Sequence, residues 1–158
     1  MADPAIEALE RRLSKVEDEL AIHSLLASYG PLADAGLGAD AAALWTEDGA
    51  YDPGGVTRAE GTEAITAIYV GDRHQGLITA GSMHMTAPVQ VTLDGDQASA
   101  VGYSILAVNR DGRFTLARAS INRWTLTRTA AGWRIAERIN RVLDGSAEAE
   151  AILASVAR

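Results

Sequence analysis

Tyr29, Asp34 and His84 carry the side chains best suited to proton transfer. His84 lies in the run Ser82-Met83-His84-Met85, where strand alternation puts it on the opposite face from the two methionines. Imidazole titrates near neutral pH and can serve as a base, although a strand histidine is also a common hydrogen-bonded structural residue. Asp34 follows an expected helix end, which suits a turn or cap aspartate as well as a functional carboxylate. Tyr29 is either a core ring or a hydrogen-bond donor to a substrate oxygen or leaving group.

Four further residues are candidates for binding a substrate. Trp45 either packs a helix against a sheet or forms a pocket wall that selects a flat or polycyclic ligand. Arg138 is either a solvated surface arginine or an inward one, which would need Asp34, another carboxylate or a substrate anion as its partner. Asn122 and Asn140 are polar pocket liners or residues of the sheet edge.

Composition excludes several other classes of protein. The 158 residues have a net charge of −7 and no cysteine, so a nucleic-acid interface, a disulfide framework and a zinc–thiolate site are not expected. No nucleophile elbow, phosphate-binding glycine loop or metal-spaced histidine cluster occurs, and we expect neither a metal nor another cofactor. The acidic start and the absence of a long apolar run predict no membrane partner and a cytoplasmic location.

Hydrophobic periodicity predicts helices first and strands afterwards. A helix is expected from Pro4, after the cap residue Asp3, to a stop at Gly30-Pro31. Its apolar stripe either packs on the protein's own sheet or reaches a neighbouring subunit; the stripe consists of Ile6, Leu9, Leu13, Val16 and Leu20. Two further helices are expected at 39–46 and from Thr62 to Val70, with a short strand at 50–51, a loop at 71–76 and a last helix within 146–157. Five strands joined by turns are expected at 77–86, 89–93, 98–109, 113–128 and 133–143.

This order predicts one α+β domain over residues 1–158. A curved antiparallel sheet with the N-terminal helices on its concave face would form a cone. A cone of this kind has a cavity between its sheet and its helices, and such cavities are where ligands bind.

The element order and the segments "LLASYGPLADAGLGADAAALWTEDGAYD", "SMHM" and "GWRIAERINRV" resemble the nuclear-transport-factor-2-like superfamily, and its SnoaL-like branch fits best. That branch includes scytalone dehydratase, bile-acid 7α-dehydratase and hexachlorocyclohexane dehydrochlorinase. The resemblance implies that Asp34 and His84 form a catalytic dyad and that Tyr29 assists it. It further matches Trp45 to a pocket tryptophan and Arg138 to a late-strand arginine. The apolar run Leu106-Ala107-Val108 stands where some members carry a second acid–base residue.

The resemblance therefore implies a cofactor-independent lyase, of the dehydratase or formaldehyde-eliminating retro-aldol type. Its substrate would be a bulky hydroxylated apolar molecule of aromatic, polyketide or steroid type. An isomerase or polyketide cyclase with the same dyad, or a noncatalytic binding or interaction module, is the alternative. A homo-oligomer is expected, and a trimer is favoured over a dimer.

Overall fold

A computed structural model describes residues 3–54 and 57–157 of the chain. The helices are α1 (Pro4–Asp34), α2 (Gly38–Ala42), α3 (Gly61–Val70), α4 (Asp72–Ala80) and α5 (Ala147–Ala154), followed by a 3₁₀ turn at Ser155–Ala157. The strands are β1 (Trp45–Asp52), β2 (Ala59–Glu60), β3 (Ser82–Thr86), β4 (Gln90–Asp94), β5 (Gln97–Arg110), β6 (Arg113–Thr129) and β7 (Gly132–Val142).

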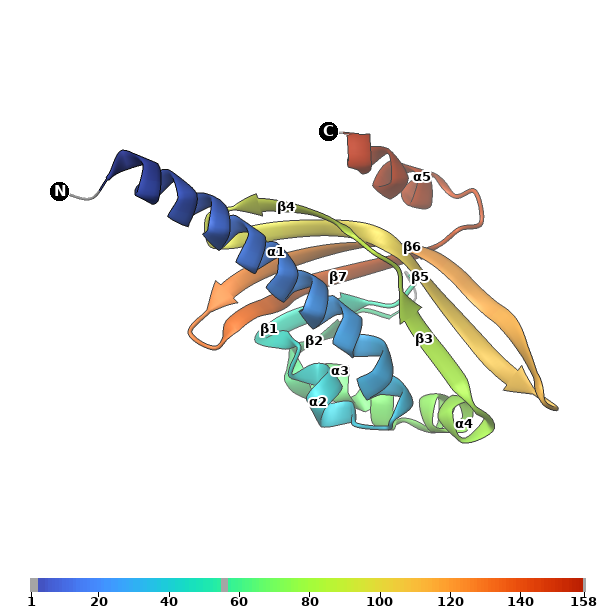
Figure 1. The fold of residues 1–158 in the computed structure, drawn as a ribbon. Helices are drawn as coiled ribbons and strands as arrows, with labels where there is room; N and C mark the ends of the chain where they lie inside the picture. The colour runs from blue at the N-terminus through green and yellow to red at the C-terminus, as the bar shows by residue number, and fades with distance from the viewer. Residues whose placement is uncertain (1–2, 55–56, 158) are drawn as a thin grey trace.

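The strands form one open sheet in the order β2-β1-β7-β6-β5-β3, and β4 continues beside β5. The long strands β5, β6 and β7 pair in antiparallel register, whereas β1 pairs with β7 in parallel. Figure 1 shows α1 to α4 on one side of this bent sheet and α5 on the other. The predicted α+β class with helices on the concave face is confirmed, and the sheet is mixed because of the β1–β7 pair.

The main core lies between the sheet and the helices. Trp124, Leu126 and Ile135 from the sheet pack with Ile22 and Leu26 of α1, and all are almost fully buried. A smaller cluster under α5 contains Ile121, Ala149 and Ile152. None of the helices in the described part of the chain is long and apolar enough to cross a membrane.

Helix α1 begins as predicted but ends later than predicted. The Asp3 side chain caps it by accepting a hydrogen bond from the Ala5 amide at 2.9 Å, and Pro4 occupies the first turn. The expected stop at Gly30-Pro31 is wrong, because the helix continues through Pro31 to Asp34. A proline inside a helix lacks one hydrogen bond, so contacts with the rest of the protein must hold this last turn in place.

Three other local predictions are also wrong. Trp45 is the first residue of strand β1 and not part of a helix. The segment predicted as a loop at 71–76 is the start of α4, so His74 lies on a helix. The strand predicted at 77–86 begins only at Ser82, because α4 continues to Ala80. Tertiary packing places the first two segments, since Trp45 and His74 are buried.

Candidate active site

Asp34 and His84 meet at the junction of α1 and β3. The Asp34 Oδ1 atom lies 2.7 Å from His84 Nδ1. The Ser82 hydroxyl donates to the same oxygen at 2.7 Å, and the His84 backbone amide donates to Oδ2 at 2.7 Å. Because an ionised carboxylate only accepts hydrogen bonds, Nδ1 carries a proton and Nε2 of the neutral ring keeps its lone pair. The ring is therefore held in the tautomer that leaves Nε2 as a base.

Gly30 allows this meeting of helix and strand. A Cβ at this position would collide with the His84 carbonyl oxygen and lie 3.0 Å from the His84 carbonyl carbon. The backbone of α1 therefore packs directly on the backbone of β3, which only glycine permits. Asp34 lies one turn further along the same helix, so the contact at Gly30 positions its carboxylate against β3.

The Tyr29 ring lies edge-on to His84, with 6.2 Å between the ring centroids. The Arg138 guanidinium lies over the face of Tyr29 at 4.4 Å, in a cation–π arrangement. Burial is the main cause that raises the pKa of Tyr29, so its phenol stays neutral and can donate a proton or a hydrogen bond.

Arg138 is 3% exposed, and no carboxylate among the described residues lies within ion-pair distance of it. Its Nε and Nη2 atoms donate to Asn122 Oδ1 at 3.1 and 3.0 Å. Asn140 donates to the same oxygen at 2.7 Å. The faces of Tyr51 and Trp124 lie 5.0 and 5.5 Å from the guanidinium. Amide dipoles and aromatic faces stabilise this buried cation without neutralising it. Its positive charge therefore acts on the adjoining cavity.

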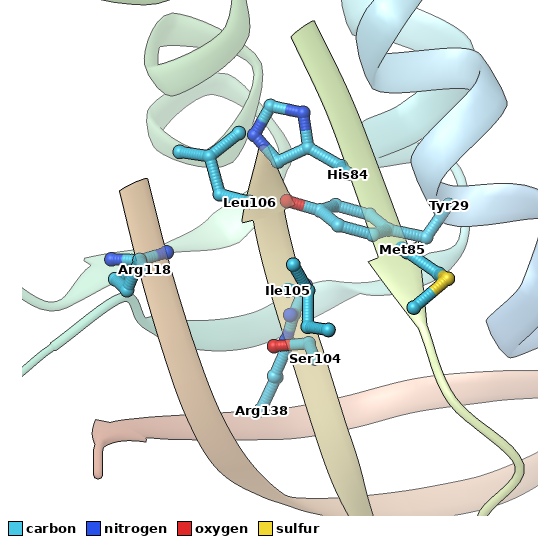
Figure 2. Close-up of a pocket in the computed structure, with 8 residues that line it drawn as sticks. All are labelled: Tyr29, His84, Met85, Ser104, Ile105, Leu106, Arg118 and Arg138. Carbon is cyan, nitrogen blue, oxygen red and sulfur yellow. The ribbon is translucent and has the colours of Figure 1, made fainter. Parts of the chain in front are cut away.

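Tyr29, His84 and Arg138 line a small cavity. Figure 2 shows His84 and the Tyr29 hydroxyl at one end of it, and Ser104 with Arg138 at the other. Its wall is completed by Met85, Ile105, Leu106 and Arg118. The free volume of about 10 Å³ is close to what one water molecule requires, so a larger ligand must displace apolar side chains of the wall.

The structure brings together Tyr29, Asp34, His84 and Arg138 and places the other candidates behind them. Trp45 packs edge-on against Tyr29 at 6.2 Å between ring centroids and does not line this cavity. Asn122 and Asn140 are fully buried and do not line this cavity. Asn122 binds Arg138 and Ser104, whereas Asn140 donates to Asn122 and to Ser104.

His74 is a neighbour of the site that was not among the predicted site residues. Its ring centroid lies 5.4 Å from that of His84, and its Nδ1 atom lies 3.0 Å from the Tyr69 carbonyl oxygen. Burial, followed by the nearby His84, lowers the pKa of His74, which favours the neutral ring. The loop expected at 71–76 would put this residue at the rim of a pocket, whereas the structure buries it on α4. Arg118 and Ser104 were missed because alternation alone does not show where a sheet bends.

In the described parts of the chain, no group of three or more histidine, cysteine or acidic side chains could hold a metal ion.

A bent sheet with N-terminal helices packed on its concave face is the architecture of the cone-shaped nuclear-transport-factor-2-like proteins. The SnoaL-like domain matches residues 14–139, and the chain belongs to this family.

A crystal structure of an NTF2-like protein with a cystatin-like fold from Novosphingobium aromaticivorans is 43% identical and has a TM-score of 0.91. That match covers 97% of this chain and 98% of the other. ActVI-ORFA from Streptomyces coelicolor has the same fold at 20% identity and a TM-score of 0.70, covering 78% of this chain and 96% of that one. A Catenulispora acidiphila protein in complex with S-DNPA also shares the fold, at 21% identity and a TM-score of 0.69, covering 78% and 91%. No curated protein matches the sequence significantly.

Proposed function

We propose that the chain is a lyase that needs no cofactor and acts on a hydroxylated apolar small molecule, with His84 as its base. The observation that carries the proposal is the 2.7 Å contact between Asp34 Oδ1 and His84 Nδ1 at the wall of a cavity. The carboxylate fixes the tautomer and stabilises the imidazolium that forms when Nε2 takes a proton. The His84 side chain is 12% exposed, so this proton transfer is largely shielded from bulk water.

In an elimination of water, the His84 Nε2 lone pair takes a proton from a substrate carbon. The electrons of the broken C–H bond form the new C=C bond, and the C–O bond to the leaving hydroxyl breaks. Tyr29 donates a hydrogen bond to the departing oxygen, and the proton that His84 removed passes from Nε2 to this oxygen, which leaves as water. In a retro-aldol reaction the same base takes a hydroxyl proton instead, and the electrons of the O–H bond form the C=O bond of the small carbonyl compound that departs. The electrons of the broken C–C bond stay on the remaining substrate carbon, which takes the proton back from the His84 imidazolium.

Arg138 is proposed to stabilise the negative charge that either reaction develops on a substrate oxygen. Support comes from its burial, from its lack of a carboxylate partner among the described residues, and from its place at the cavity wall beside Ser104. Such fixed positive charge is worth more in a site that excludes water than at a surface. Asn122 and Asn140 are positioning residues for this guanidinium, and Trp45 supports the Tyr29 ring.

The size of the cavity limits how a bulky substrate can bind. The free volume of about 10 Å³ holds a group the size of one water, so wall side chains such as Met85, Ile105 and Leu106 must move before the reacting end of an aromatic, polyketide or steroid-like molecule can lie between His84 and Arg138. The lyase and the alternative isomerase or cyclase share the same base, because all three reactions begin with removal of a proton.

The test is turnover of a panel of hydroxylated aromatic, polyketide and steroid compounds in D₂O, followed by mass spectrometry. A lyase gives a product that lacks the atoms of one water or one formaldehyde, whereas the product of an isomerase or cyclase keeps all the heavy atoms of the substrate and gains mass only through deuterium that replaces transferred protons. His84→Ala should abolish either product, and His23→Ala, which changes a histidine outside the cavity, should not. Undiminished turnover in the His84→Ala variant contradicts the proposal.

A further inference from the structure

The first five turns of α1 expose an apolar stripe. Ile6, Leu9, Leu13, Val16 and Leu20 are between 53% and 61% exposed. Their alternating spacing of three and four residues is that of a coiled-coil seam. The face that α1 buries against the core is a different one, formed by Ile22, Leu26, Tyr29 and Ala33.

The stripe has no covering element within the described chain. Figure 1 shows the first turns of α1 extending past the edge of the sheet. The interpretation that the stripe packs on the protein's own sheet is therefore wrong for these five residues, since each remains more than half exposed. A contiguous apolar surface of this kind is typical of a binding surface for another protein segment.

We infer that the stripe binds the same stripe of a second copy, with the two α1 helices antiparallel, which gives a dimer in place of the trimer that the resemblance favours. The seam residues alternate between heptad positions a (Ile6, Leu13, Leu20) and d (Leu9, Val16), and an antiparallel pair sets each a residue against a d residue. Leu13 then packs on the second copy's Val16, and Leu9 packs on its Leu20. The contact is then two-fold symmetric, so each residue pair occurs twice.

A hollow in the surface supports the antiparallel direction. It lies where α1 passes the β3–β4 connection and has a volume of about 250 Å³. His23, Leu26 and Ala27 line it from α1, and residues 86–89 line it from the connection. The same register brings the second copy's Ile6 level with His23, at this hollow. In a parallel pair, Ile6 would lie beside its own counterpart and no apolar side chain from the second stripe would reach the hollow.

The charged residues on one side of the stripe attract each other in this register, and those on the other side repel each other. Arg12 and Glu19 occupy the first side, and the antiparallel pair places Arg12 next to the second copy's Glu19. Glu10 and Glu17 occupy the other side and face one another across the pair, which weakens it. A parallel pair would instead place Arg12 next to the second copy's Glu17. Charge reversal therefore distinguishes the two directions.

Light scattering of the full chain should show an even number of copies that falls by half in the Leu13→Glu variant. Leu37→Glu, a matched change of another exposed leucine (47% exposed), should leave the mass unchanged. Circular dichroism establishes that both variants remain folded. A monomer at about 0.1 mM, an odd number of copies, or an assembly that survives Leu13→Glu overturns the inference. Binding of the stripe to phosphatidylglycerol vesicles by a protein that stays monomeric would overturn it too.

The charge variants test the direction of the pair. Arg12→Glu should weaken dimerisation roughly tenfold, and adding Glu19→Arg should restore it. Glu10→Lys should tighten the dimer by removing the repulsion with Glu17. Restoration of the Arg12→Glu variant by Glu17→Arg, but not by Glu19→Arg, would establish a parallel pair and overturn the inference.

Cross-linking provides an independent measurement, because the natural chain has no cysteine. The double variant Ile6→Cys, His23→Cys should form a covalent dimer on oxidation. The two positions are separated by about 25 Å along one helix, so they cannot join within one chain. Ile6→Cys alone should stay uncrosslinked; a disulfide in that single variant would show parallel helices and refute the arrangement.

Discussion

Replacing Gly30 by alanine tests whether the contact between α1 and β3 builds the site. The new methyl group would occupy the place of the His84 carbonyl oxygen and lie 3.0 Å from its carbonyl carbon. Ordinary contact between carbon atoms is about 3.5–4.0 Å, so the two segments must separate by roughly an ångström. The Asp34–His84 contact, at 2.7 Å, cannot survive a separation of that size with good geometry.

The change in the free energy of unfolding is the sum of destabilising and stabilising contributions. Overpacking costs about 1–3 kcal/mol, and loss of the one hydrogen bond between Asp34 and the His84 ring adds about 1.5–3 kcal/mol. Alanine returns at most about 1 kcal/mol through its better helix propensity. Placing it before Pro31 disfavours helical backbone and reduces that gain. We expect a net loss of about 3 kcal/mol in the free energy of unfolding, or a melting temperature lower by about 6–12 °C.

Urea unfolding followed by tryptophan fluorescence and circular dichroism measures this loss. The matched control is Gly76→Ala in α4, where an added Cβ meets nothing within 4 Å. That variant should be unchanged or stabilised by up to about 1 kcal/mol. Nitrogen NMR of the imidazole should also show the Nδ1 proton of His84 lost or exchanging rapidly in Gly30→Ala alone. Equal stability of Gly30→Ala and the natural chain would refute the close-packing explanation of the site.

The remaining predictions concern the polar groups around the cavity. Asp34→Asn should lower turnover by roughly 10²- to 10⁴-fold, because an amide cannot stabilise the imidazolium, while Ser82→Ala should lower it less than tenfold because the His84 contact remains. Since the pKa of His74 is lowered by burial, the unfolded chain binds a proton at this residue more readily and stability falls with pH below about 6.5. Urea midpoints measured from pH 5 to pH 7 should therefore vary less in His74→Gln. Asn122→Leu should cost about 2–4 kcal/mol in urea unfolding, because it leaves a buried guanidinium without its amide acceptor.

The strands β5, β6 and β7 could be predicted because the residues in the turns that join them are typical of hairpin turns. The connection between β5 and β6 contains Asp111 and Gly112, and both have positive φ values, 52° and 80°. Gly95, between β4 and β5, has a φ of 60°. These residue types favour that backbone region locally, so the hairpins can be read from short stretches of sequence.

Elements that depend on distant contacts could not be predicted in the same way. The last turn of α1 continues past Pro31 although local preference opposes it. The residues from Gly71 to Gly76 resemble a loop, yet most of them form the start of α4, where His74 packs against Tyr69 and His84. The parallel pairing of β1 with β7 joins segments more than eighty residues apart, and nothing in either strand specifies it.

The candidate site was only partly predictable for the same reason. Asp34 and His84 could be selected by residue type and by family resemblance, because the last turn of a helix and an alternating strand are local patterns. Arg118 and Ser104 lie at the cavity wall through the curvature of β5 and β6, where the register shifts between Leu106 and Ala107. A shift of this kind changes which face a side chain occupies. It cannot be located from alternation alone.

The Asp34 carboxylate has structural and chemical partners at the same time, which couples the stability of this fold to its proposed chemistry. The Ser82 hydroxyl and the His84 backbone amide bind it whether or not the imidazole ever moves a proton. Those two contacts hold the last turn of α1 against β3, and the third, to Nδ1, orients the base. Loss of activity in an Asp34 variant is therefore not sufficient evidence for a catalytic carboxylate. The decisive comparison is with Ser82→Ala, which weakens the structural anchor and leaves the Asp34–His84 contact, so that activity and stability can be separated.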